Sequence, residues 1–473
     1  MALRASERIW RTTAIVMCAA VPTSFYVLGD LTDAFPGVLT AAAVEEGPAS
    51  GPRAVAEDWE RLTAGDQLPP IDRPGSPVDP ADLQERMAAG AQLPVVDGGL
   101  AFSVVDAGTG EVLAERDADA ALVPASTLKL LTAAAVLRQY SGDEVLTTRA
   151  AVQDGVVTLI GGGDMTLSED ELRGLATQAA ELATTQAAAE GTVQVSVVLD
   201  DSYLVGGANA AWGNNGTAGG WVTPTASLAL DGGWLDGEQY GPKSSDPAGD
   251  VARRFAEQLT EAGLEVTGEV TAGEAPAEAP SVEIHSEPLA EIVRHTLLIS
   301  DNTTAELLAH LVALSRGEET TPAGAAAAVE AEIRDLASEI GVTDADLAGL
   351  ELYDGSGLSR QNRVPPALFS AVLAEVASGE VPRLEQILFD VPIAGLSGTL
   401  AERFTADGTV DASGLVRGKT GYLGGAATLA GVAVLPDGRT VGYSIVVHGF
   451  DGADALAARA AVDQVAAEMV QVD

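Results

Sequence analysis

Extended runs of hydrophobic residues stand near both ends of the folded part of the chain. Residues 100–105 and 111–114 are two such runs separated by a polar turn that contains two glycines, which predicts a β-hairpin. Residues 427–435 and 441–447 repeat this arrangement around a Pro-Asp-Gly-Arg turn, which predicts a second hairpin. Because strands stand at both ends with helices between them, we expect an α+β domain with an antiparallel sheet that joins the two ends of the chain.

Helical patterns occupy the segments between and after these strands. Residues 126–140 carry an apolar face of leucine, alanine and valine, and residues 289–298, 302–314 and 453–470 are helical by pattern or composition. We therefore predict helices in these four segments, flanking the sheet.

The middle of the chain follows a different pattern. Short valine-rich runs are broken by glycines or aspartates, as in residues 156–163 and 193–201, and such runs are typical of strands. We therefore expect one domain built from residues 81–145 and 286–473, interrupted by a large strand-rich insertion over residues 146–285.

The first 80 residues resemble neither domain. Arginines at positions 4, 8 and 11 precede an uncharged run from residue 12 to residue 29, which is the layout of an export signal. Because Pro22 interrupts a run that is already short for a membrane span, residues 1–30 are expected to be either a cleaved signal peptide or an uncleaved membrane anchor. Residues 31–80 are rich in proline and acid, and we expect them to form a linker. The rest of the chain would then lie on the extracellular face of the cytoplasmic membrane or in the cell wall.

The charge and the cysteine count exclude some functions. The chain has 69 acidic and 26 basic residues, a formal net charge of −43, and a nucleic-acid binder needs clustered basic residues instead. The single cysteine, Cys18, lies in the first apolar run, so no internal disulfide is possible. No His-Glu-x-x-His zinc motif is present, and the sequence implies neither a metal nor an organic cofactor.

Three short motifs carry the candidate chemistry. They are Ser126-Thr-Leu-Lys129, Ser300-Asp301-Asn302 and Lys419-Thr420-Gly421, in that order, the signature set of penicillin-interacting serine enzymes. A serine hydroxyl is a weak nucleophile until a base takes its proton, and a lysine one helical turn later is positioned to do so. Lys129 must then be neutral, which requires burial or a second cation such as Lys419 nearby.

The remaining residues of the three motifs have expected roles around this pair. Ser300 would relay the proton toward the leaving amine, and Asn302 would hold a substrate amide. Lys419 and Thr420 would bind the carboxylate of a terminal D-alanine, and Gly421 would let the substrate backbone approach the strand. The oxyanion hole would be formed by the backbone N–H groups of Ser126 and Tyr422.

The use of lysine supports this interpretation. Lys129, Lys243 and Lys419 are the only lysines among the 26 basic residues, and two of the three stand in the motifs. Arginine cannot lose its proton in a protein, so lysine is needed at position 129. At position 419 we expect a compact charge that does not titrate, and at position 243 an ordinary surface residue.

Two competing chemistries have less support. A Ser-His-Asp hydrolase would draw on His285, His295, His310 or His448, but the chain has no Gly-x-Ser-x-Gly turn. The Gly-Lys-Thr at 418–420 could belong to a phosphate-binding loop, but that loop needs a glycine where Ser413 stands.

With these residues in view, the chain resembles the class C low-molecular-mass penicillin-binding proteins, the D-alanyl-D-alanine carboxypeptidases that also act as DD-endopeptidases. The resemblance covers about residues 80–473. It departs from the family pattern at Tyr422, where a small residue is usual, and at Arg363-Val-Pro, which lacks the expected threonine. Further family-like stretches are Leu159-Ile-Gly-Gly-Gly-Asp164, Val198-Leu-Asp-Asp-Ser202, Asp354-Gly-Ser-Gly-Leu-Ser-Arg360 with Asn362, and Ala394-Gly395 with Gly398-Thr-Leu400.

The resemblance implies a penicillin-binding, transpeptidase-like domain similar to that of the serine β-lactamases. It also implies cleavage of peptidoglycan stem peptides through an acyl-enzyme on Ser126, with β-lactam antibiotics as covalent inhibitors. The 174 positions between Ser126 and Ser300 favour a carboxypeptidase over a compact β-lactamase. A β-lactamase and a catalytically silent wall-binding protein remain as alternatives.

Two acids of the insertion are candidates for substrate recognition. Asp200 or Asp201 could bind the free amine of a diamino acid in the stem peptide. Because aspartate is common in turns, a structural role at the end of a strand is the alternative.

Overall fold

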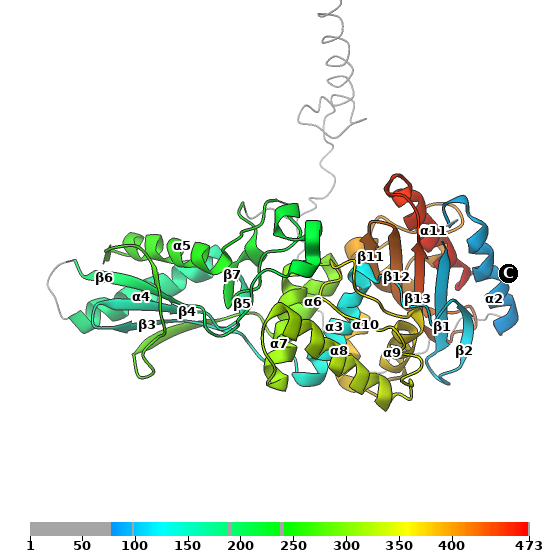
Figure 1. Cartoon of the computed structure of the whole chain (residues 1–473), viewed down its shortest axis with the longest axis horizontal. Coiled ribbons are helices and arrows are strands. Elements are labelled where there is room, and N and C mark those ends of the chain that lie inside the picture. Colours follow the sequence, from blue (N-terminus) through cyan, green and yellow to red (C-terminus); the bar gives the residue numbers. More distant parts are fainter. Residues whose placement is uncertain (1–76, 97–98, 188–191, 237–240, 472–473) are drawn as a thin grey trace, which may run out of the picture. The chain divides into compact units, whose positions relative to one another are not determined.

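The hydrophobic runs at the two ends of the chain form a single antiparallel sheet in the computed structural model, which describes residues 77–96, 99–187, 192–236 and 241–471 (Figure 1). The strand order is β11-β12-β13-β1-β2, so the first strand pairs with the last, in register from Leu100 opposite Val447 to Asp106 opposite Val441. The predicted α+β fold with a sheet joining the two ends is confirmed. The strands are β1 (Leu100–Asp106), β2 (Val112–Arg116), β11 (Val416–Leu423), β12 (Ala426–Val434) and β13 (Thr440–His448).

Helices cover both faces of this sheet because its central strands are apolar on both sides. Alternate residues of β12 enter different cores: Leu429 packs with α2 and α11, whereas Ala430 packs in the helical core on the other face. The helices are α2 (Pro80–Ala89), α3 (Leu128–Gln139), α6 (Leu289–Ile299), α7 (Asn302–Arg316), α8 (Pro322–Glu339), α9 (Pro366–Ser378), α10 (Gln386–Asp390) and α11 (Ala455–Glu468).

A second sheet lies in the middle of the chain, and we call residues 147–285 the insertion and the remaining described residues the body. Its strand order is β10-β3-β4-β6-β8, and β9 also pairs with β6. Two further strands, β5 and β7, pair in parallel. These strands are β3 (Thr147–Gln153), β4 (Val156–Ile160), β5 (Asp164–Leu167), β6 (Gln194–Asp200), β7 (Leu228–Leu230), β8 (Glu265–Val266), β9 (Thr271–Ala272) and β10 (Ser281–His285).

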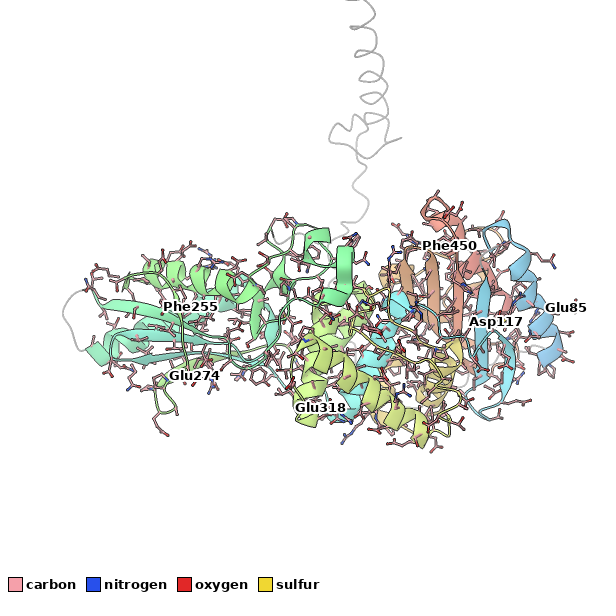
Figure 2. All side chains as sticks on the ribbon, viewed as in Figure 1. Glu85, Asp117, Phe255, Glu274, Glu318 and Phe450 are labelled. Carbon is pink, nitrogen blue, oxygen red and sulfur yellow. The ribbon has the colours of Figure 1, made fainter. Side chains whose placement is uncertain are left out.

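The description of the insertion as strand-rich is incomplete. Two long helices, α4 (Glu169–Ala187) and α5 (Pro247–Glu261), share one core with the valines of the sheet. Phe255 of α5, labelled in Figure 2, is fully buried in that core. Helices form here because Leu172, Leu175 and Ala179 repeat at helical spacing and supply the apolar face that one side of the sheet needs.

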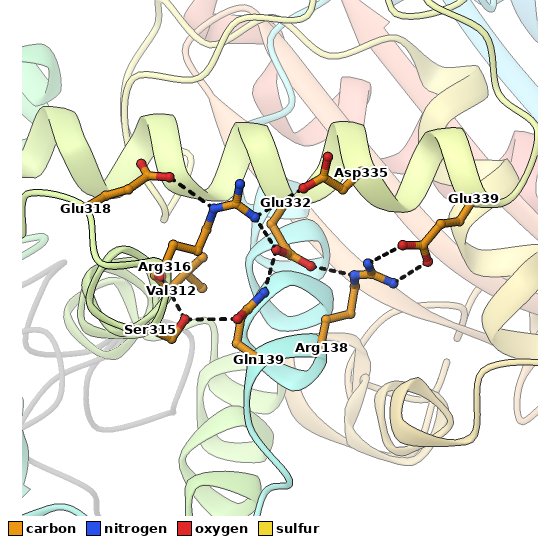
Figure 3. A network of polar contacts seen from close by, with 9 residues as sticks. All are labelled: Arg138, Gln139, Val312, Ser315, Arg316, Glu318, Glu332, Asp335 and Glu339. Carbon is orange, nitrogen blue, oxygen red and sulfur yellow. Dashed lines mark hydrogen bonds and ion pairs between the residues drawn. The ribbon is translucent and has the colours of Figure 1, made fainter.

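A network of buried charges holds α3, which follows the candidate nucleophile, against α7 and α8 (Figure 3). Glu332 of α8 is 2% exposed and accepts hydrogen bonds from Arg138 Nε, Gln139 Nε2 and Arg316 Nη1, each at 2.6 Å. Arg138 also forms a two-pronged pair with Glu339. Because a buried carboxylate is stable only when it is paired, this network fixes how the three helices meet.

The surface carries most of the acid. Glu85, Glu274 and Glu318, all labelled in Figure 2, are exposed. No helix among the described residues combines the length and the hydropathy that crossing a bilayer requires. The predicted signal or anchor at 1–30 and almost all of the predicted linker at 31–80 lie outside the described residues.

Candidate active site

A strained turn presents Ser126. Ala125 has φ 48°, a left-handed conformation that costs a residue with a Cβ about 1–3 kcal/mol. Ala125–Thr127 form a 3-10 turn that leads directly into α3 at Leu128, so the helix predicted over residues 126–140 opens with a 3-10 turn. The strain is accommodated by two glycines: a Cβ on Gly357 would lie 1.9 Å from Ala125 O, and one on Gly421 would lie 2.1 Å from Thr428 Oγ1 and 3.0 Å from Pro124 O.

Lys129 lies beneath the Ser126 hydroxyl. Its Nζ donates to Ser126 Oγ at 3.1 Å, to Asn302 Oδ1 at 2.7 Å and to the Ser356 carbonyl at 2.7 Å. The side chain is fully buried, and burial lowers the pKa of Lys129 to about 8 against the opposing effect of nearby carboxylates. The lysine is therefore poised to exchange a proton near neutral pH.

Two buried carboxylates lie behind this lysine. Glu306 of α7 accepts from the Gly355 and Ser356 amides and, at 3.3 Å, from the Trp212 indole of the insertion. Asp354 accepts from the amides of Gly357 and Ser359. Burial raises the pKa of Glu306 to about 7, and the Asp354 charge adds to this. The two acids shape the loop whose Ser356 carbonyl accepts a hydrogen bond from Lys129 Nζ.

The second motif forms the link between α6 and α7. Ser300 has φ 65°, and its hydroxyl makes no hydrogen bond to any residue that the structure describes. Asp301 caps α7 by accepting from the Thr304 amide at 2.9 Å. Asn302 is engaged at both ends of its side chain, because Oδ1 accepts from Lys129 and Nδ2 donates to the Trp221 carbonyl at 2.9 Å.

The third motif lies on β11, the edge strand of the sheet. Lys419 is fully buried and donates to the Thr420 carbonyl at 2.8 Å. Burial, together with the positive charges of Lys129 and Arg403, holds the pKa of Lys419 well below its usual range, so the surroundings of this lysine oppose the permanent charge expected there. Tyr422 follows this motif on β11, and the Cζ atom of Arg459 lies 4.5 Å from the centre of its ring.

One groove brings most of the predicted site residues together. Its cavity of about 710 Å³ is lined by six of them: Ser126, Ser300, Asn302, Thr420, Gly421 and Tyr422. Lys129 and Lys419 are buried behind this lining. The three motifs, up to 293 positions apart in the sequence (419 minus 126), therefore meet at one place.

Asp200 and Asp201 are not brought to this groove, because neither lines its cavity. Asp200 accepts from the Ser202 hydroxyl at 2.6 Å and the Ala275 amide at 2.8 Å, and Asp201 accepts from the Ser227 amide at 2.7 Å. Both carboxylates thus bind their own part of the insertion, as the structural alternative describes.

Lys243, which the sequence assigns to the surface, lies beside the second motif through its contact with Thr303. Lys243 is 7% exposed, so its assignment to the surface is wrong: Nζ lies 3.5 Å from the centre of the Trp234 ring and donates to Gly232 O and Thr303 Oγ1. The sequence feature that could have indicated a buried role for Lys243 is the rarity of lysine in this chain. No set of three or more His, Cys, Asp or Glu side chains in the described ranges is arranged to hold a metal ion.

Three features surround one groove: a serine beside a buried lysine, a Ser-x-Asn link, and an edge strand that carries Lys-Thr-Gly. Together they define the serine enzymes of the penicillin-binding fold. Comparison with known proteins narrows this class. The chain belongs to the D-Ala-D-Ala carboxypeptidase 3 (S13) family, whose model matches residues 83–243 and 235–469.

Relatives and a solved structure agree with this family. The chain is 34% identical over 373 residues to carboxypeptidase DacB of Mycolicibacterium smegmatis, with 76% of this chain and 79% of that protein covered. It is 29% identical to a D-alanyl-D-alanine carboxypeptidase of Actinomadura, with 76% and 79% covered. Penicillin-binding protein 4 of Haemophilus influenzae has the same fold, with a TM-score of 0.65 at 20% identity over 82% of this chain and 98% of that one.

Proposed function

We propose that this protein is an exported serine DD-peptidase that cleaves the D-Ala-D-Ala end of peptidoglycan stem peptides, the D,D crosslink between them, or both. The observation that carries this proposal is the buried Lys129 Nζ at 3.1 Å from Ser126 Oγ. Family membership and the names of the relatives support the same reaction.

The proposed acylation begins with proton transfer. Neutral Lys129 takes the Ser126 proton while Oγ attacks the carbonyl carbon of the penultimate D-alanine. The resulting oxyanion accepts hydrogen bonds from the backbone N–H groups of Ser126 and Tyr422. The C–N bond then breaks, and Lys129, with Ser300 as relay, returns the proton to the leaving amine. Water hydrolyses the ester by the same proton path in reverse. Asn302, already bonded to Lys129 and to the insertion, holds this geometry.

The proposal also covers localisation and inhibitors. The basic and apolar residues at the N-terminus support export, with membrane attachment if that segment is not cleaved. β-Lactams should acylate Ser126, in keeping with the solved complex of the Haemophilus protein with a β-lactam.

Labelling with fluorescent penicillin tests the proposal. We expect a label that persists on the wild-type protein and is absent from Ser126→Ala, with release of D-alanine from stem peptides by the wild type alone. Loss of the label within seconds would indicate a β-lactamase, and no label on a folded wild-type protein would indicate a silent wall-binding protein. Products from crosslinked muropeptides would separate carboxypeptidase from endopeptidase action.

A further inference from the structure

The charge of the groove is opposite to that of the whole protein. The chain has 69 acids against 26 bases, yet the residues that line the groove cavity include three arginines, Arg360, Arg403 and Arg459, and no acid. Such a groove concentrates anionic ligands. The question is which of the cations meets the carboxylate of the substrate's last residue.

Lys419 is poorly placed to provide that charge. Its Nζ is fully buried, donates to the Thr420 carbonyl and does not line the cavity. Burial and two neighbouring cations also lower its pKa. A side chain that is held away from the groove and that loses its proton readily is a weak partner for an anion.

Arg403 has the opposite properties. It lines the same cavity as Ser126 and Thr420, and an arginine keeps its charge at every relevant pH. Asp463 of α11 holds it in place: Asp463 Oδ2 accepts from Nε at 3.0 Å, and Oδ1 accepts from Nη2 at 2.5 Å. Nη1 makes no hydrogen bond within the described part of the chain, so it is free to donate to a ligand.

Thr420 marks the place where the anion would lie. Its hydroxyl hydrogen-bonds to that of Thr399 at 2.8 Å, and both threonines line the cavity together with Arg403. Two hydroxyls and a guanidinium held by an ion pair, all from residues that line one groove, are a suitable set of donors for a carboxylate.

We propose that Arg403, oriented by Asp463, binds the terminal carboxylate of the substrate beside Thr399 and Thr420, and thereby makes the enzyme selective for peptides with a free C-terminus. This inference rests on the proposed function and refines it. Lys419 then orients the edge strand through its hydrogen bond to the Thr420 carbonyl.

Paired substrates test this assignment. We compare wild type and Arg403→Gln on a peptide that ends in D-Ala-D-Ala and on its C-terminal amide, and on a penicillin and its methyl ester. Loss of one charge-assisted hydrogen bond should lower kcat/KM for the free acid by about 10- to 100-fold. The rates with the amide and the ester should change less than about threefold, so that the preference for the acid nearly disappears.

Asp463→Asn should reduce the preference partially, because the guanidinium keeps its charge and loses its orientation. The matched control is Arg439→Gln, which also breaks a pair with two acids, Asp106 and Asp437, and does not line the groove. It should leave the preference unchanged. If Arg403→Gln slows acid and amide equally, or keeps the full preference, the assignment is wrong. If the wild type cleaves neither peptide nor a crosslinked muropeptide and is not acylated by the penicillin, the proposed function fails instead.

Discussion

The body and the insertion differ in how they hold their paired charges. Around the reactive serine the body buries Lys129, Lys419, Glu306 and Asp354, each at 1% exposure or less. The ion pairs of the insertion, such as Arg173 with Asp170, are exposed to solvent. Buried charges cost desolvation energy and shift pKa values, whereas exposed ones contribute little to either. Proton chemistry is therefore concentrated in the body.

The insertion reaches the site through a few polar contacts. The Trp221 carbonyl accepts from Asn302, and the Trp212 indole donates to Glu306. Lys243, the one buried lysine of the insertion, donates to Thr303. These three contacts fall on α7, so the insertion orients groups that the body supplies. The insertion also lines the groove with Asn215 and Trp221.

The largest expected effect concerns stability. Glu332→Ala should destabilise the body by about 3 to 5 kcal/mol, because it leaves Arg138, Arg316 and Gln139 without their buried acceptor. The matched change in the insertion, Asp170→Ala, removes the exposed pair with Arg173 and should cost less than about 1 kcal/mol. Urea unfolding measures the change in the free energy of unfolding for both variants. Equal losses of stability would contradict the difference between the body and the insertion.

The pH dependence of acylation is the next largest effect. Lys129 must be neutral to act as the base, and its pKa is about 8. The rate of penicillin acylation should therefore rise about tenfold per pH unit below that value and level off above it. The Glu306 carboxylate raises the pKa of Lys129, so Glu306→Gln should move the midpoint to lower pH.

The control for this prediction is Asp390→Asn. Asp390 is also a buried acid of the body whose pKa burial raises to about 7, but it bonds to Gln386 and does not act on Lys129. Its replacement should leave the midpoint in place. A midpoint that stays fixed in Glu306→Gln, or moves equally in both variants, would rule out control of Lys129 by Glu306.

The sequence predicts the reacting groups better than their surroundings. Ser126, Lys129 and Lys419 stand in short motifs whose residue types are required by the chemistry. Apolar runs near both ends of the chain were enough to predict strands β1, β2, β12 and β13 of the sheet. Glu306 contacts Trp212, and Arg403 contacts Asp463. The partners are distant in the sequence, so no local sequence pattern predicts these contacts. The helices α4 and α5 were missed because valine-rich strands dominated the pattern around them.

The smallest expected effect tests whether the insertion acts on the site at all. Lys243→Met keeps much of the packing against Trp234 but removes the hydrogen bonds to Gly232 and Thr303, so the link between α6 and α7 should be held less firmly. We expect kcat for stem peptides to fall about tenfold with little change in KM, the cost of roughly one buried hydrogen bond to a charged donor.

A double-mutant cycle separates this positioning role from a general loss of stability. If Lys243 acts through Thr303, then Lys243→Met combined with Thr303→Ala should lower kcat about as much as either change alone, since both remove the same contact. Additive losses would mean that the lysine affects the site by another route. Unchanged kcat in a folded Lys243→Met protein would mean that catalysis does not depend on this contact.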